Sequence, residues 1–341
     1  MKIDGFLIAI LCAVALALLA PGIGADNGPL HLATLTTIGI GLVFFLHGAA
    51  LSPHALKAGA ANWRLHAFVH SSTFLLFPAI GLVVFWGARG LIAPEVRLGF
   101  FYLCALPSTI SSSVAMTALA RGNVSGAIFD ATLSGLMGMV LTPLFVGLVA
   151  TGITGHLPLL PAILSVLETL LLPFAAGQLL RRWIGGFVAR NKAWANKVDR
   201  TVIVMIVYGA FCDSTAGGLW SKYAPLTLLG IAVLVVALLA FVLVTTTMAS
   251  RFLRFSREDE AAAVFCGSKK SLANGAPIAL VLFGHNPALG MIMLPVMLYH
   301  QAQLIVCSIL ARRYAERAAT EIETTVQVAT RGVIEPTSAG S

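Results

Sequence analysis

Two adjacent lysines, Lys269 and Lys270, lie in the middle of a stretch that is otherwise uncharged from residue 261 to residue 283. A stretch of roughly 20 apolar residues is long enough to cross a bilayer. A charged side chain at that depth costs roughly 2.5–3.5 kcal/mol, so a pair of them is expected to serve a function. Ser271, Asn274 and Pro277 weaken a helix here and offer polar ligands. Charge on a broken membrane helix is typical of a transport site, and we take both lysines, Ser271 and Asn274 as candidate binding residues.

A second polar stretch, Pro107–Ser113, places five hydroxyl groups within seven residues of another apolar run. Proline removes a backbone hydrogen bond, and hydroxyl groups can satisfy the carbonyl that it frees. The stretch has two interpretations, a kinked packing helix or an unwound segment that binds a cation or a polar substrate. Its pairing with the lysine segment favours the second, in which Ser111, Ser112 and Ser113 are binding residues.

Asp130 is the acidic residue best placed to interact with these lysines. It lies inside an apolar run and shares a helix face with Ser134, four residues further on. An isolated buried carboxylate is unfavourable, whereas a nearby ammonium stabilises its ionised form. We therefore expect Asp130 to face Lys269 or Lys270, with Ser134 beside it.

The composition indicates an integral membrane protein. The 341-residue chain is 58% hydrophobic and 11% charged, whereas soluble domains carry about 25% charged residues. The net charge of +8 does not indicate nucleic-acid binding, because Lys and Arg concentrate in cytoplasmic loops of membrane proteins. The five cysteines lie in apolar runs and are expected to be buried thiols. His47, His70 and His300 are interpreted as interhelical contacts, and we expect no metal centre and no organic cofactor.

Apolar periodicity predicts an all-α protein with ten transmembrane helices. Splitting the chain near residue 155 gives two five-span halves, about 4–150 and 158–311, within one transporter domain over residues 1–315. Because five is odd, the second half must be inverted relative to the first. The fourth and ninth spans occupy equivalent positions and both are broken. The expected spans are 4–21, 31–51, 65–87, 98–120, 123–150, 158–180, 201–217, 224–249, 261–283 and 288–311.

The distribution of basic residues predicts the orientation. With ten spans, 17 Lys and Arg residues fall on the side of both termini and 3 on the other side. The positive-inside rule then places both termini in the cytoplasm. We expect residues 316–341 to form a disordered cytoplasmic tail. The use of Ala, Leu and Arg fits a bacterial inner membrane, and membrane lipid is the expected surrounding partner.

These features resemble a known family. The ten-span layout, the stretch Pro107–Ser113 running into residues 120–123, and the segment Phe265–Leu272 followed by Gly275 and Pro277 are similar to the bile acid:sodium symporter superfamily. More narrowly, they resemble its divergent branch related to the seventh member of solute carrier family ten. The resemblance covers about residues 5–315, and the ninth-span segment is its most specific part.

The resemblance implies a core domain that moves against a panel domain, with two broken helices crossing at mid-membrane. It places sodium ligands at Ser112 and Ser113, and at Thr73 on the third span where the family has Gln. Asp130 lies on the same fifth-span face as the family's hydroxyl ligands, so a sodium site at Ser112, Ser113 and Asp130 is the expected one. The family's ninth-span Glu has no counterpart, because the lysine pair occupies that neighbourhood.

The replacement of the family's ninth-span Glu by the lysine pair affects which ion could be coupled to transport. A lysine ammonium can replace a bound sodium ion electrostatically, so sodium, a proton or no ion at all remain open as the coupling partner. The leading interpretation is a secondary active transporter that moves a small organic anion by alternating access. The alternative is a channel-like or non-transporting membrane regulator of ion homeostasis. An enzyme is not expected, since the chain lacks the sequence motifs of intramembrane hydrolases and prenyl transferases. The substrate, the stoichiometry, the direction of transport and the oligomeric state are not determined by the sequence.

Overall fold

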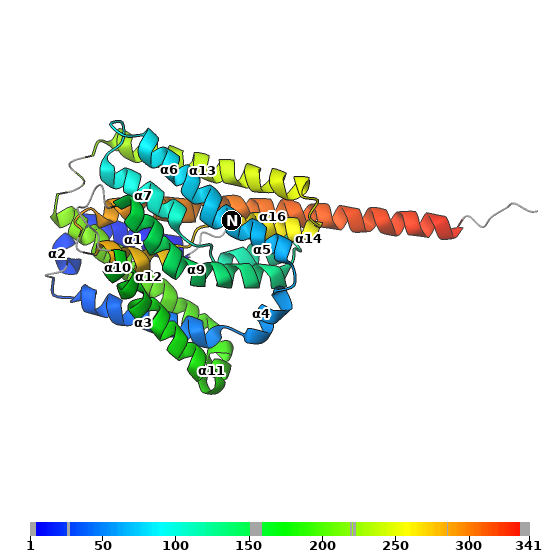
Figure 1. The fold of residues 1–341 in the computed structure, drawn as a ribbon, viewed down its shortest axis with the longest axis horizontal. Coiled ribbons are helices and arrows are strands. Elements are labelled where there is room, and N and C mark those ends of the chain that lie inside the picture. Colours follow the sequence, from blue (N-terminus) through cyan, green and yellow to red (C-terminus); the bar gives the residue numbers. More distant parts are fainter. Residues whose placement is uncertain are drawn as a thin grey trace, which may run out of the picture.

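A computed structural model describes residues 5–25, 28–150, 159–218, 220, 223–284 and 286–334, although side chains from residue 318 onward lie outside the described part. All regular structure in these ranges is helical (Figure 1). The elements are α1 (Gly5–Leu19), α2 (Pro21–Gly24), α3 (Leu32–Ala50), α4 (Pro53–Gly59), α5 (Trp63–Ser71), the π-helical turn η1 (Ser72–Leu76), α6 (Phe77–Gly87), α7 (Pro94–Ala105), α8 (Ser111–Leu119), α9 (Val124–Ala150), α10 (Leu159–Val166), the π-helical turn η2 (Leu167–Leu171), α11 (Leu172–Arg190), α12 (Lys192–Ala216), α13 (Pro225–Phe252), α14 (Arg257–Gly267), α15 (Leu272–Phe283) and α16 (Leu289–Ile334).

The all-helical membrane architecture is confirmed. Each of the ten expected spans coincides with a helix or with consecutive helices. Six helical segments of the described chain are long and apolar enough to cross a membrane, and α1 is a shorter apolar helix. The fourth and ninth expected spans are each divided into two short helices, and α12 begins with a polar turn. The ten-span count and the inverted repeat stay predictions. The α16 helix is assigned as far as Ile334, past the expected span end, and the disordered tail over 316–341 stays a prediction.

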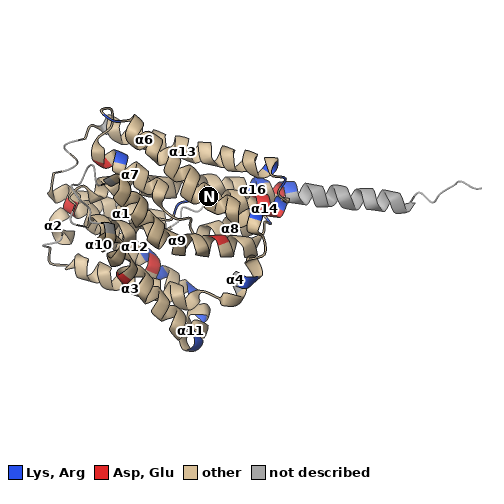
Figure 2. Ribbon diagram, viewed as in Figure 1, with Lys and Arg blue, Asp and Glu red and all other residues tan. Residues whose placement is uncertain are grey.

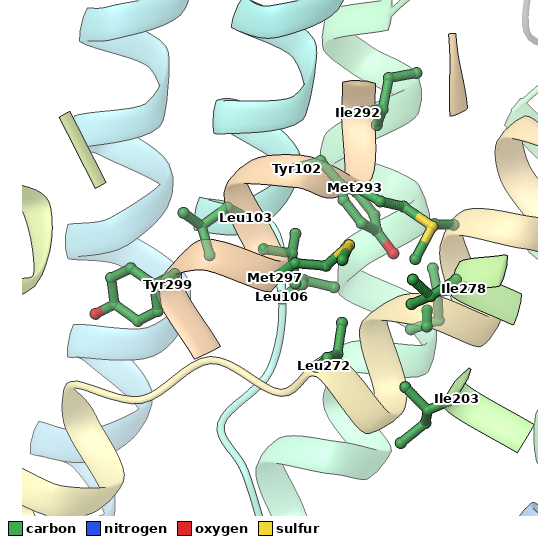
Figure 3. Packing of buried hydrophobic residues seen from close by; sticks show 14 of the residues in the cluster. Tyr102, Leu103, Leu106, Ile203, Leu272, Ile278, Ile292, Met293, Met297 and Tyr299 are labelled. Carbon is green, nitrogen blue, oxygen red and sulfur yellow. The ribbon is translucent and has the colours of Figure 1, made fainter. Parts of the chain in front are cut away.

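The helices pack in two groups. In the first group, α3 lies along α11, and α1 and α2 pack on α12. In the second group, α7 packs against α6 and α16, and α14 contacts α5, α8 and α13. Figure 1 shows α3 and α11 on one side of the molecule and α6 and α13 on the opposite side. Figure 3 shows Tyr102, Leu103 and Leu106, at the end of α7, close to Met293 and Met297 of α16 in the buried apolar interior.

Two glycines allow α3 and α11 to approach closely. A Cβ atom added at Gly177 of α11 would overlap with the carbonyl oxygen of Phe45 on α3. Gly48 of α3 has the reciprocal relation to Phe174 of α11. Small residues commonly permit such close backbone contact between membrane helices.

We therefore expect Gly177→Ala to force α3 and α11 apart and to destabilise the protein by about 1–3 kcal/mol. Gly186→Ala on the same helix is the matched control, because a Cβ at Gly186 meets open space. Thermal unfolding of the two variants in detergent tests the contact. Equal melting temperatures would show that the close approach contributes nothing to stability.

Candidate functional site

The two broken helices cross at their interruptions. The first break separates α7, which ends at Ala105, from α8, which begins at Ser111. The second separates α14, which ends at Gly267, from α15, which begins at Leu272. A backbone hydrogen bond of 2.9 Å from Ser271 N to Pro107 O joins the two breaks directly.

Hydroxyl groups satisfy the carbonyl end of α14. A helix leaves its last four carbonyl groups without intrahelical partners, and burial without a substitute partner is costly. Here the substitutes are side chains from three other segments, and the acceptors are consecutive residues. Ser113 donates to Phe265 O (3.0 Å), Ser108 to Cys266 O (2.6 Å), Ser72 to Gly267 O (2.7 Å) and Tyr299 to Ser268 O (2.6 Å).

The Lys270 ammonium satisfies carbonyl groups at the end of α7. Its Nζ donates to the carbonyl oxygens of Cys104 (2.8 Å), Leu106 (2.6 Å) and Thr73 (3.0 Å). An ammonium group has three hydrogens to donate, so these three acceptors match its protonated form. The C-terminal end of α7 also carries partial negative charge, which favours a cation there. Lys270 is only 1% exposed, so the polar backbone replaces water around its charge.

The Thr73 carbonyl is available because of a proline. In η1 the hydrogen bonds join residues five apart, as shown by the Phe77 N–H donating to Ser72 O. The next bond of that register would come from residue 78, which is proline and has no N–H. The freed carbonyl of Thr73 accepts from Lys270 instead. π-Helical turns inside α-helices are often found at functional sites.

Two further residues, Phe77 and Gln303, hold Lys270 in place. Its Nζ lies 4.0 Å from the centroid of the Phe77 ring, a cation–π distance. Its backbone N–H donates to Gln303 Oε1, and its carbonyl accepts from Gln303 Nε2, both at 2.8 Å. Gln303 is fully buried on α16, so it connects the second break to that helix.

Gln303→Leu is expected to destabilise the protein by about 1–3 kcal/mol for each backbone group of Lys270 that loses its partner. Gln301→Leu is the control, because the buried Gln301 Nε2 has no hydrogen-bond partner among the described residues. Removing that amide is expected to be neutral or stabilising. A chemical or thermal unfolding curve separates the two variants, and equal losses would contradict the assigned role of Gln303.

Lys269 is buried with far fewer partners. Its Nζ donates to Ser112 O at 2.8 Å and lies 5.7 Å from the centroid of the Phe265 ring. The structure describes no further hydrogen bond from this Nζ, although the residue is 0% exposed. Ser112 lies in the first turn of α8, and this N-terminus has no side-chain cap. The ammonium and the partly positive helix end are therefore neighbours, an arrangement that favours an anion.

The expected pairing of Asp130 with a lysine is wrong. Within the described chain the titratable partners of Asp130 are His66, whose Nδ1 lies 2.8 Å from Oδ1, and His70, whose Nε2 lies 3.5 Å away. Asp130 is fully buried in α9 where that helix passes α5. The lysines need no carboxylate, because main-chain carbonyl groups accept their hydrogen bonds.

The remaining candidate residues have separate contacts. The Ser112 and Ser113 hydroxyl groups both contact Thr109 Oγ1, at 2.6 Å and 2.9 Å, and Ser111 is exposed at the start of α8. Ser134 Oγ accepts from Ser108 N, and Ser271 Oγ accepts from Asn274 N and so caps α15. The breaks thus bring most of the candidates together. The sodium site expected over Ser112, Ser113 and Asp130 stays a prediction.

Several contributing residues were missed in the sequence. Gln303 and Tyr299 belong to a polar stretch of the last helix, but nothing local indicated that they would contact the ninth-span break. His66 and His70 are four residues apart and share a helix face, and this spacing is the signal in the sequence that could have pointed to them. In the described residues no group of three or more His, Cys, Asp or Glu side chains could hold a metal ion.

The apolar helices and the buried charged crossover define a polytopic membrane protein of the transporter class. The model of the SBF-like CPA transporter family matches residues 4–316, and the chain belongs to that family. It is therefore a transporter of the bile acid:sodium symporter kind, which confirms the resemblance inferred from its motifs.

Named relatives cover nearly the whole chain. A Pseudomonas aeruginosa protein, PA2026, is 48% identical over 92% of this chain and 93% of the relative. The Escherichia coli protein named "Putative symporter YfeH" is 45% identical over 92% and 93% of the two chains. The zebrafish (Danio rerio) protein named sodium/bile acid cotransporter 7 is 30% identical over 90% and 92%.

Proposed function

We propose that the protein is a secondary active transporter that moves a small organic anion across a bacterial inner membrane by alternating access. The observation that carries the proposal is the buried Lys269 ammonium beside the uncapped N-terminus of α8. Two positive groups at a break between helices provide a site for a carboxylate or sulfonate. The names of the relatives make a bile acid the first substrate to test.

The packing suggests how the site is exposed to each side. We propose that the group containing α1, α3, α11 and α12 is the panel and that the group containing the two breaks is the core. The inverted repeats over about 4–150 and 158–311 belong to this proposal, as does a single transporter domain over 1–315. Rocking of the core against the panel would then carry the crossover from one side to the other.

The orientation is proposed on the distribution of charge. Figure 2 shows Lys and Arg gathered near α4, near α14 and the adjoining part of α16, and at the turn between α11 and α12. The positive-inside rule places these segments, and both termini, in the cytoplasm. A cysteine-accessibility scan of the α11–α12 turn against the segment between α6 and α7 would test this orientation.

Counterflow in proteoliposomes tests transport. Vesicles loaded with unlabelled taurocholate, or with one of a panel of small carboxylates, should accumulate the labelled compound transiently. Parallel assays in sodium and choline salts report whether sodium is coupled. A cation conductance without counterflow of any anion tested would instead support a channel-like regulator.

A further inference from the structure

Asp130 lies at a joint between three helices. Its Oδ1 lies 2.8 Å from Nδ1 of His66 in α5, and the other ring nitrogen of His66, Nε2, lies 2.9 Å from Gly59 O at the end of α4. Gly59 itself packs closely on α9, because a Cβ there would overlap with Ser125 O. The short helix α4 connects α3, of the group proposed as panel, to α5, of the group proposed as core.

The hydrogen bonds fix one proton in this cluster. A carbonyl oxygen only accepts, so His66 Nε2 must carry the hydrogen that lies toward Gly59. The 2.8 Å contact between His66 Nδ1 and Asp130 Oδ1 then requires a second proton, shared between the imidazole and the carboxyl group. The pair is thus either an imidazolium with a carboxylate or a neutral imidazole with a carboxylic acid.

Unused polar atoms remain beside that pair. Asp130 Oδ2 and both ring nitrogens of His70 are buried without a hydrogen-bond partner among the described residues. Burial of such atoms is costly unless a ligand or water satisfies them. His70 Nε2 is 3.5 Å from Asp130 Oδ1, so a small movement would form a charge-assisted bond if His70 were protonated.

We propose that Asp130, His66 and His70 form a proton-binding site at the joint of α4, α5 and α9. A proton fits better than a metal ion, because hard cations such as sodium prefer several oxygen ligands and this carboxylate faces imidazole nitrogens. Protonation of His70 would draw α5 toward α9 and secure the end of α4. The proposal that this site binds a proton does not depend on transport, whereas the use of that proton as the coupling ion rests on the proposed transport function.

His70 faces two titratable groups, Asp130 and His66, and Asp130 has His66 as its nearer partner and His70 as its second. The Cys266 thiol of α14 also faces Asp130. Lys269, which follows the end of α14, lies near the same thiol. Phe129 packs on His66 and Phe74 stacks near His70, so two aromatic rings cover the imidazoles.

Ring-labelled histidine in the purified protein tests the site by nuclear magnetic resonance. Single substitutions to Gln at His66, His70 and His54 assign the signals, and exposed His54 serves as the reference. We expect the His70 ring signals to change as the pH is lowered, because the imidazole takes up a proton beside the Asp130 carboxylate. In Asp130→Asn the midpoint of the His70 titration should fall by about half a pH unit or more, because the carboxylate that favours the imidazolium has been removed. His54 should keep its midpoint.

Three results would overturn the proposal. One is a His70 signal that does not change with pH while the protein stays folded, and another is the same midpoint with and without the Asp130 carboxylate. The third is a shift of the His66 and His70 signals on exchanging choline for sodium, which would assign the site to a metal cation.

If Asp130→Asn fails to fold, His70→Gln provides the second test. Its melting temperature should vary less with pH than that of the wild type or of His54→Gln, and an unchanged pH dependence would also refute the site. No transport substrate is needed in either experiment, so failure here would leave the transport proposal untouched.

Discussion

Lys270→Met is expected to remove most of the folded protein. The substitution deletes the donor to three buried carbonyl groups, and each unpaired group costs about 1–3 kcal/mol, so the total is on the order of 3 kcal/mol or more. That is a large part of the usual margin of stability, about 5–15 kcal/mol. The yield of monodisperse protein and its melting temperature in detergent measure the effect. Wild-type stability in Lys270→Met would show that water or a rearranged backbone satisfies the carbonyl groups.

The shorter variant Lys270→Ala gives this prediction a second readout. It leaves space beside three carbonyl oxygens, which are ligands that suit a hard cation. We expect sodium chloride to raise its melting temperature relative to choline chloride by more than in the wild type, because a ligand of the folded state stabilises it by mass action. An equal response of the two proteins to sodium would argue that the ammonium does not occupy a cation site.

Lys269→Met is expected to reduce anion transport strongly while leaving the fold intact. Its ammonium is fully buried but has one described hydrogen bond, to Ser112 O. Replacing a poorly paired buried charge by an apolar side chain of similar size is often neutral or stabilising. The loss of one cation at the proposed anion site should nevertheless weaken anion binding at least tenfold, which corresponds to about 1.4 kcal/mol.

The two lysines thus serve as controls for each other. Lys269→Met should keep its melting temperature but lose most of its counterflow, whereas Lys270→Met should have a lowered melting temperature. Full counterflow activity in Lys269→Met would place the anion elsewhere. Lys269→Arg, which keeps the charge, should retain more activity than the methionine variant if charge is the requirement.

Much of the architecture followed from local patterns. Apolar run length and Gly/Pro interruptions located helices in all ten expected ranges, because a bilayer requires continuous apolar segments with internally paired backbones. The breaks were predictable for the same reason, since Pro107 lacks an N–H and the residues around Lys269 weaken a helix. The residue at which the second break ends was not predictable, because the helix α15 begins at Leu272 and accommodates Pro277 in its interior.

The partners of the charged groups could not be read from the chain. Charge alone suggested that Asp130 would pair with a lysine, yet Asp130 contacts His66 and His70 while the lysines bind carbonyl oxygens. The sequence determined the membrane class, the family, the positions of the breaks and the presence of buried charge, because hydropathy, proline and charge act locally. Only the tertiary structure decided which groups neutralise that charge. Lys270 binds main-chain carbonyls at the end of α7 and in one π-helical turn, and Lys269 binds the Ser112 carbonyl in the first turn of α8. Residue types alone do not show which main-chain carbonyl a distant lysine will reach.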